Sequence, residues 1–242
     1  MKPLGTVGSA LILMFASACG GGGSSSAPST PAAPTPTPTP TPTTITVYGS
    51  YDKEVNDANL RGGWTADSVS PDAALFAVGW SYWLRSIDLP APARVYSGYG
   101  SAVMFDVSSL AGRAVARATL RLDVTTAKKD SRVAPQIKVN AFTSSWNTTT
   151  LSWNVWAAIG YQTSGEAQIA APSSTGPVEW DVTTIVRNWA SGAWRNYGFK
   201  VSVDKYPDPG GDDSWATTVF CGTLPASWKP ECQRPQLIIE YQ

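Results

Sequence analysis

Four basic side chains occupy outward positions in segments whose apolar residues alternate as in β-strands. They are Arg117, Arg121, Lys138 and Lys200. Guanidinium and ammonium groups form charge-assisted hydrogen bonds with carboxylates. If these segments are neighbours in one sheet, the four groups form a basic ladder that binds the carboxylates of an acidic polysaccharide. The alternative is a solvated sheet face whose charges are unrelated to one another.

A cluster of aromatic residues offers a second binding chemistry. The chain contains 11 tryptophans, and an exposed ring stacks on the C–H surface of a sugar, although rings also pack beneath long loops. Trp156 lies in polar, serine-containing surroundings and is freer to be exposed. Four tryptophans lie on apolar faces and are expected in the core: Trp146, Trp153, Trp180 and Trp189. The densest candidate site comprises Trp80, Tyr82, Trp83, Tyr96 and Tyr99.

Catalysis finds little support among these residue types. The chain has no histidine, which excludes histidine-based triads. A glycoside hydrolase needs two carboxylates across a groove, and a lyase can use a tyrosine and an arginine. The acidic residues, however, lie at strand ends and outward positions, where capping or solvation accounts for them. We therefore expect no enzymatic activity.

An acidic loop is the one candidate for a metal. Asp208, Asp212 and Asp213 lie within a segment rich in glycine and proline. Oxygen ligands on a flexible loop can hold Ca²⁺, but the spacing does not match an EF-hand. Acidic turns are common without a metal. A turn is the favoured interpretation, and no cofactor is expected.

The N-terminal region has the pattern of a secreted and anchored protein. Residues 1–18 combine Lys2, a short apolar stretch and small residues, as in a secretory signal. The small residues precede Cys19 as in a lipobox, so Cys19 is expected to carry lipid; an ordinary cleaved signal is the alternative. Residues 19–44 are rich in Gly, Ser, Thr and Pro and predict an extended tether. These features predict an outer-membrane or cell-surface lipoprotein.

The remaining cysteines, Cys221 and Cys232, flank a segment that contains proline and glycine. In an oxidising compartment such a pair is expected to form a disulfide. A metal site would require more ligands than these two residues supply. The disulfide is therefore predicted.

Residues 45–242 have the size of one β-rich domain. Eighteen basic and 18 acidic residues balance, and this balance, with no basic tail, gives no indication of nucleic-acid binding. Period-two alternation recurs, for example at residues 118–124 and 237–241, and predicts antiparallel strands with one wet face. The spacing of Val182, Val186 and Trp189 predicts one short helix over 181–192, which Gly192 ends. The predicted fold is an all-β antiparallel sandwich.

Several segments, in order, resemble the DNRLRE-domain proteins, a group that includes carbohydrate-binding module family 96. The matching residues are Phe105–Leu110, Ala118–Leu122, Leu151–Asn154, Asp181–Gly192 and Arg234–Pro235. Departures from the pattern are Met104 in place of a basic residue, an apparent insertion over 80–100, and the cysteine loop after Phe220. The resemblance implies a jelly-roll sandwich that binds acidic, alginate-type polysaccharides without cleaving them. A structural or adhesive surface protein is the alternative function.

Overall fold

The computed structural model describes residues 41–60, 64–69, 75–85, 93–130, 132–205, 215–223 and 232–242. Within strand residues 56–60, 64–69, 81–85 and 93–97 only the backbone is described. The predictions for the signal, Cys19 and most of the tether lie outside the described residues, as do those for Asp208, Asp212 and Asp213. In the described part, no helix is long and apolar enough to span a membrane.

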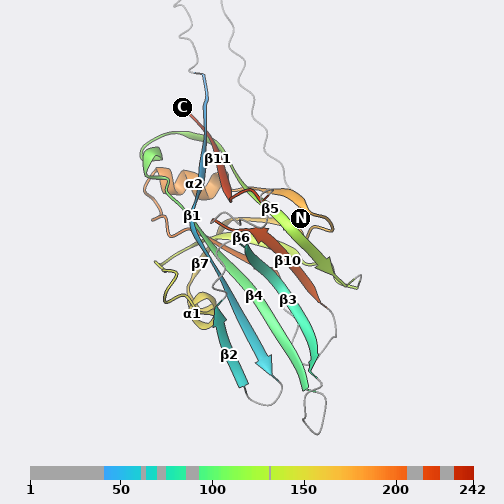
Figure 1. Cartoon of the computed structure of the whole chain (residues 1–242). Coiled ribbons are helices and arrows are strands. Elements are labelled where there is room, and N and C mark those ends of the chain that lie inside the picture. The colour runs from blue at the N-terminus through green and yellow to red at the C-terminus, as the bar shows by residue number, and fades with distance from the viewer. Residues whose placement is uncertain are drawn as a thin grey trace, which may run out of the picture. The chain divides into compact units, whose positions relative to one another are not determined.

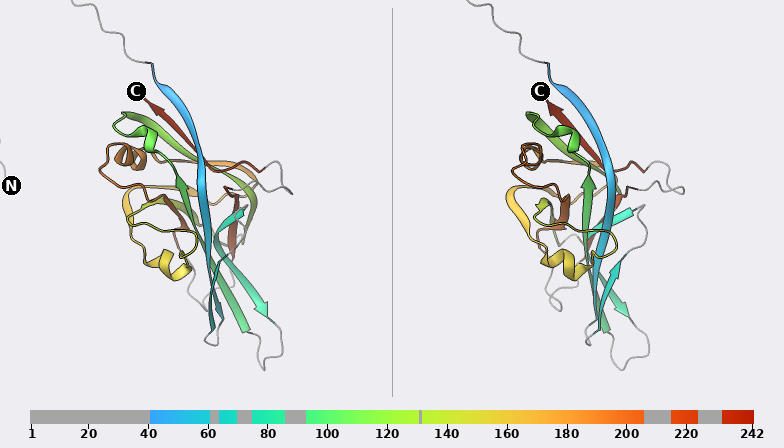
Figure 2. Two further views of the ribbon diagram at one scale, coloured as in Figure 1. Left: turned by 60° about the vertical axis from the view of Figure 1, so that its left-hand side comes forward. Right: turned by 90° about the vertical axis from the view of Figure 1, so that its left-hand side faces the viewer.

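Among the described residues, eleven strands form one sheet. They are β1 (Thr43–Leu60), β2 (Trp64–Val69), β3 (Leu75–Arg85), β4 (Ala93–Phe105), β5 (Val115–Lys129), β6 (Gln136–Phe142), β7 (Tyr161–Ala170), β8 (Gly176–Asp181), β9 (Phe199–Val203), β10 (Ala216–Cys221) and β11 (Gln236–Tyr241). The pairings β1–β11–β5–β10–β3–β4 return to β1 and close a six-strand barrel. The long strands β1 and β4 run side by side, as Figures 1 and 2 show.

The all-β prediction is confirmed, but the strands do not specifically form a jelly-roll sandwich. They belong to one sheet that closes on itself, and β9, β6 and β7 continue it beyond β4. Alternation identifies the buried face of each strand, whereas closure depends on which strands pair and with what stagger. The alternating pattern therefore could not separate a sandwich from a barrel.

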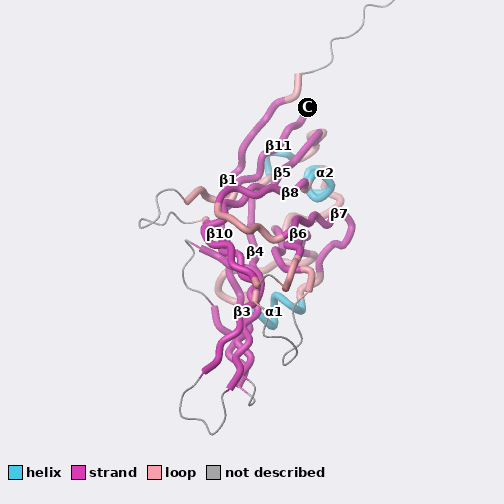
Figure 3. Tube along the Cα trace, turned by 90° about the vertical axis from the view of Figure 1, so that its right-hand side faces the viewer, coloured by secondary structure: helices cyan, strands magenta, loops and turns pink. Residues whose placement is uncertain are grey.

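Two α-helices accompany the described strands, where the sequence predicted one. The predicted helix is α2 (Thr183–Ala190), and Gly192 follows it with φ +76°. The unpredicted helix is α1 (Trp153–Ala158), which Ser152 caps by accepting a hydrogen bond from the Val155 amide. Six residues are too few to show a helical repeat. A short 3₁₀ turn also covers Ser108–Leu110. Figure 3 shows the two helices at separate places beside the sheet.

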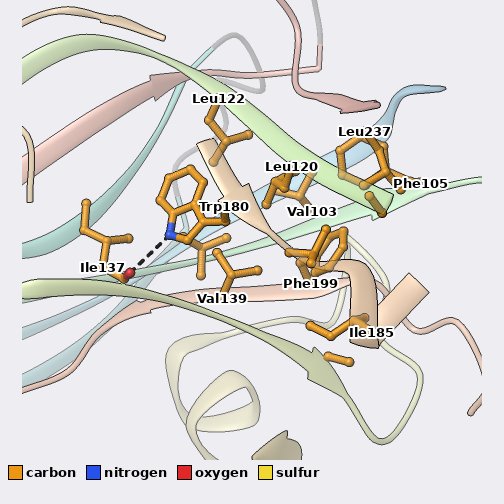
Figure 4. Packing of buried hydrophobic residues seen from close by; sticks show 14 of the residues in the cluster. Val103, Phe105, Leu120, Leu122, Ile137, Val139, Trp180, Ile185, Phe199 and Leu237 are labelled. Atoms are coloured by element: carbon orange, nitrogen blue, oxygen red, sulfur yellow. Dashed lines mark hydrogen bonds between the residues drawn. The ribbon is translucent and has the colours of Figure 1, made fainter. Parts of the chain in front are cut away.

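The main core joins the barrel strands to β6, β8, β9 and α2, and it contains the predicted core tryptophan Trp180. This side chain is 1 % exposed, and its indole Nε1 donates a hydrogen bond of 3.2 Å to the carbonyl of Ile137. Leu120, Leu122 and Val139 lie around it in Figure 4. The indole thus ties β8 to β6 across the interior while satisfying its own polar group.

A second core lies on the opposite face of β4. Its buried members are Val55, Ala102, Phe142, Trp146, Leu151 and Trp156. Val55 and Ala102 lie on β1 and β4, Phe142 ends β6, Trp146 and Leu151 lie in the segment that leads into α1, and Trp156 lies in α1 itself. Because this segment covers part of the sheet, both faces of β4 are buried there. Trp153 is partly buried against the same cluster.

The predicted disulfide joins Cys221 at the end of β10 to Cys232, with Cα atoms 5.5 Å apart. Replacing both cysteines by serine is expected to lower the free energy of unfolding by about 3 kcal/mol, because the open loop gains entropy in the unfolded chain. Urea denaturation of the double variant measures this loss, and the reduced parent protein is the control. A double variant as stable as the oxidised parent would contradict the prediction.

Candidate functional site on the outer face of β6, β7 and β9

Five polar and aromatic residues gather on the outer face of three neighbouring strands. The strand order β9–β6–β7 brings them together, and Asn140 lies directly opposite Lys200 in the β6–β9 register. We call this set the lysine face: Lys138, Asn140, Tyr161, Glu166 and Lys200. Two of its members, Lys138 and Lys200, belong to the predicted basic ladder. The other three were not predicted.

The centre of the lysine face is a hydrogen-bonded group of three side chains. Lys138 Nζ lies 2.8 Å from Glu166 Oε1, and Asn140 Nδ2 donates to Glu166 Oε2 at 3.0 Å. The hydrogen bond to Glu166 raises the pKa of Lys138 above its ordinary value. Burial alone would raise the pKa of Glu166, but the hydrogen bonds from Lys138 and Asn140 outweigh it and lower that pKa. Both groups are therefore charged at neutral pH.

Lys200 does not lie on the solvated surface that its place in the alternation predicted. Its side chain is 5 % exposed, and Nζ donates a 2.9 Å hydrogen bond to the carbonyl of Trp156. Nζ also lies 4.1 Å from the ring centroid of Trp156 and 4.9 Å from that of Tyr161. Burial lowers the pKa of Lys200 to about 8. The reason for the difference is α1, which covers this part of the sheet.

Two glycines on β4 form the floor for α1. A Cβ on Gly100 would lie 2.4 Å from Trp156 Cζ2, and one on Gly98 would lie 3.0 Å from Trp153. The two indoles stack at 5.2 Å between centroids, and Trp156 Nε1 donates to the carbonyl of Ser101. Of the two possibilities for Trp156, exposure and packing, the structure shows packing, since the residue is 4 % exposed. Its indole instead supports Lys200 from beneath.

The four predicted basic residues do not form one ladder. Arg117 and Arg121 lie on β5, and three strands, β10, β3 and β4, separate β5 from β9 in the sheet order. Arg121 Nε lies 4.0 Å from Asp123, its own neighbour along β5. Alternation assigned the outward direction of these side chains, but it carried no information on strand order. The basic groups thus divide between two parts of the sheet.

The predicted aromatic cluster is not an exposed platform as far as its side chains are described. Trp80 is 5 % exposed and packs in the barrel core, so the expectation of an exposed indole is wrong. Tyr99 is partly buried, and the side chains of Tyr82, Trp83 and Tyr96 lie outside the described residues. Three described aromatic residues are exposed, Tyr48, Trp215 and Tyr161, and of these Tyr161, at 45 %, lies on the lysine face. Its position at the start of a polar alternating segment, Tyr161–Ala170, was the signal for it.

The lysine face can bind a ligand through several chemistries at once. Glu166 presents a planar carboxylate that the buried Asn140 holds in place, Lys138 donates, and the partly exposed ring of Tyr161 lies beside Lys200. Among the described residues, no group of three histidine, cysteine, aspartate or glutamate side chains is placed to hold a metal ion.

Comparison with known families places this face within a recognised module. The sequence model of carbohydrate-binding module family 96 matches residues 97–207. That segment runs from β4 to the loop after β9 and contains all five residues of the lysine face. No curated protein matches the chain. The predicted resemblance to the family is confirmed, while the DNRLRE name stays a prediction. Residues 97–207 are thus similar to carbohydrate-binding module family 96.

Proposed function

We propose that this protein holds a polysaccharide at the cell surface, without cleaving it, by means of the lysine face. The observation that carries the proposal is the Lys138–Glu166–Asn140 group beside the exposed ring of Tyr161. All four residues lie in the segment that matches a family of carbohydrate-binding modules. A module of this kind is a binding domain and not a catalytic one.

The residue types suit the two surfaces of a sugar. Hydroxyl groups donate to the carboxylate of Glu166 and accept from Lys138, while the buried Asn140 holds Glu166 in place by its hydrogen bond. The C–H surface of the same sugar stacks on Tyr161, whose ring is exposed at 45 %. Tyr161 has Lys200 near one side of its ring, which limits its movement. The face is thus partly ordered before a ligand arrives, and this lowers the entropy cost of binding.

An acidic, alginate-like polysaccharide is the proposed ligand. Lys138 supplies the positive charge that a glycan carboxylate requires, and Glu166 already shares that charge in the free protein. A carboxylate on the glycan would accept a hydrogen bond from the Lys138 ammonium group, which in the free protein contacts Glu166. Neutral polysaccharides engage only the hydroxyl and ring contacts. We therefore expect the acidic glycan to bind more tightly.

The proposed location follows from the N-terminal sequence. Lipid on Cys19 would anchor the protein to the outer membrane, and the tether over 19–44 would carry the module away from the bilayer. Labelling with a radioactive or clickable fatty acid tests this part of the proposal. Label that is lost on Cys19→Ser supports it, and label that is absent from the parent protein contradicts it.

Affinity electrophoresis of the full chain tests the binding proposal, in gels that contain alginate, pectin, xylan, cellulose or no glycan. We expect retardation in alginate, and about tenfold weaker binding on Tyr161→Ala or Lys138→Ala, a change of about 1.4 kcal/mol. Lys128→Ala is the matched control, because Lys128 is exposed on β5 away from the lysine face. Retardation in no gel would contradict the proposal and favour an adhesive surface protein. Equal effects of Lys128→Ala and Lys138→Ala would contradict the assigned face.

A further inference from the structure

A cavity of about 290 Å³ lies beside the disulfide, on β5 and away from the lysine face. The residues that line it include Asp123, Thr125, Thr175, Gly176 and both cysteines of the disulfide. Thr175 is exposed and Gly176 is partly buried, so the cavity opens to solvent beside the start of β8.

The sheet register explains why a cavity forms at this point. Pairing between β11 and β5 ends at Gln236 with Arg121, and pairing between β10 and β5 begins at Phe220 with Val124. Strand β8 pairs with β5 at both places, so β10 and β11 must share the opposite edge of β5. Leu122 and Asp123 lie between the two pairings. The disulfide spans this gap, where the chain passes from β10 to β11.

A β-bulge widens the same gap. The register shifts between Val219 and Phe220, so that Thr125 is the extra residue on β5. Its Oγ1 donates a 3.3 Å hydrogen bond to the carbonyl of Val219. An extra residue bends its strand and turns its side chain away from the regular pattern. The bulge thus places a threonine hydroxyl at the wall of the cavity.

Asp123 gives the cavity its charge. It lines the cavity directly, together with the hydroxyl-bearing Thr125 and Thr175. Arg121, two residues before it on the same face of β5, is not one of the lining residues. Its Nε lies 4.0 Å from the Asp123 carboxylate, beyond hydrogen-bonding distance. A carboxylate on the wall of a cavity accepts hydrogen bonds from the hydroxyl groups of a bound molecule.

We propose that this cavity binds a single neutral sugar or polyol unit. Asp123 would accept hydrogen bonds from two neighbouring hydroxyl groups, and the hydroxyls of Thr125 and Thr175 would complete the contacts. A cavity of this volume lies at the lower limit of ligand sites, which suits one ring and not a chain. A uronic acid is disfavoured, because its carboxylate would meet Asp123. The inference rests on the proposed carbohydrate binding but assigns a second site with a different preference.

Amide NMR titration of the full chain with methyl glycosides tests the proposal. The probes are methyl glucoside, methyl mannoside and methyl glucuronide. We expect the neutral glycosides to shift the amide signals of Asp123, Thr125 and Gly176, with the uronide at least tenfold weaker. Thr175→Trp fills the cavity from its exposed rim and should weaken the binding of the neutral glycosides at least tenfold. The control is Ser174→Trp, which changes the adjacent exposed residue outside the cavity lining and should leave this binding unchanged.

A lysine-face variant, Lys138→Ala with Tyr161→Ala, separates this proposal from the proposed function. Shifts at the cavity that persist in the lysine-face variant support a second site. Three outcomes would overturn the second site. The amide shifts at the cavity could persist in Thr175→Trp, or the uronide could produce them at the same concentrations as the neutral glycosides. The shifts could also occur only at the lysine face. In the last case the polysaccharide gels still show retardation, so the proposed function stands. Loss of retardation with cavity shifts retained would instead overturn the proposed function alone.

Discussion

Replacing Trp156 by alanine is expected to lower the free energy of unfolding by about 4 kcal/mol and to abolish binding at the lysine face. The indole is 4 % exposed, lies on Gly100, and donates to the Ser101 carbonyl. Its removal leaves a cavity between α1 and β4 that the glycine floor cannot fill. Lys200 loses the ring beneath its ammonium group. Urea denaturation followed by circular dichroism measures the first effect, and affinity electrophoresis below the transition measures the second.

Two variants control for the general cost of changing α1. Trp156→Phe keeps a ring beside Lys200 but removes the indole donor, so it should cost about 1–3 kcal/mol and retain most binding. Trp153→Ala removes an indole that is only partly buried and should cost less than Trp156→Ala. Equal losses in the free energy of unfolding for the two alanine variants would show that the close packing of Trp156 on Gly100 adds nothing to stability. Full glycan binding by Trp156→Ala would contradict the role assigned to Lys200.

Replacing Glu54 by glutamine is expected to remove most of the pH dependence of stability between pH 4.5 and 7. Burial is the largest cause that raises the pKa of Glu54, a backbone hydrogen bond from Ala77 opposes it, and the nearby charge of Asp52 adds to it; the result is a pKa of about 7. The folded state then holds its proton more tightly than the unfolded state. The free energy of unfolding therefore falls, by up to ~3 kcal/mol, as pH rises from 4.5 to 7.

Urea denaturation at several pH values measures this difference. Between pH 4.5 and 7 the free energy of unfolding of the parent protein should fall more steeply than that of Glu54→Gln. At pH 8, Glu54→Gln should be the more stable of the two. Glu179→Gln is the matched control, because Glu179 is exposed on β8. Asp52 stays in place in both variants and keeps its hydrogen bond from the Thr223 amide. Parallel stability profiles for the parent and Glu54→Gln would contradict the prediction.

The elements with strong local signals were predictable. Alternation at residues 118–124 and 237–241 corresponds to β5 and β11, and the apolar spacing over 181–192 corresponds to α2. The disulfide followed from the cysteine count and from the oxidising compartment that the N-terminal pattern predicts. The family followed from motifs in a fixed order. Each of these signals depends on residues close together in the chain or on residue type.

The candidate site was predictable only in part. Lys138 lies on an outward face as predicted, and its partner Glu166 is 28 residues further along the chain, on the next strand in the sheet. Lys200 was expected at the surface and is buried beneath α1, against Trp156 of that helix. Trp80 was a candidate for an exposed ring and lies in the main core. Alternation can indicate neither which outward face a helix covers nor which aromatic residues pack inside.

The amino-acid sequence by itself determined the all-β class, the α2 helix, the disulfide and the family. These depend on the hydrophobic period and on residue chemistry, which act locally. The tertiary structure alone decided that the sheet closes into a barrel, that Lys138 and Lys200 share a face apart from Arg117 and Arg121, and that a cavity opens where β10 and β11 meet β5. Strand order and register arise from long-range pairing, because backbone hydrogen bonds are alike at every residue and only the packing of the whole core selects among the possible pairings.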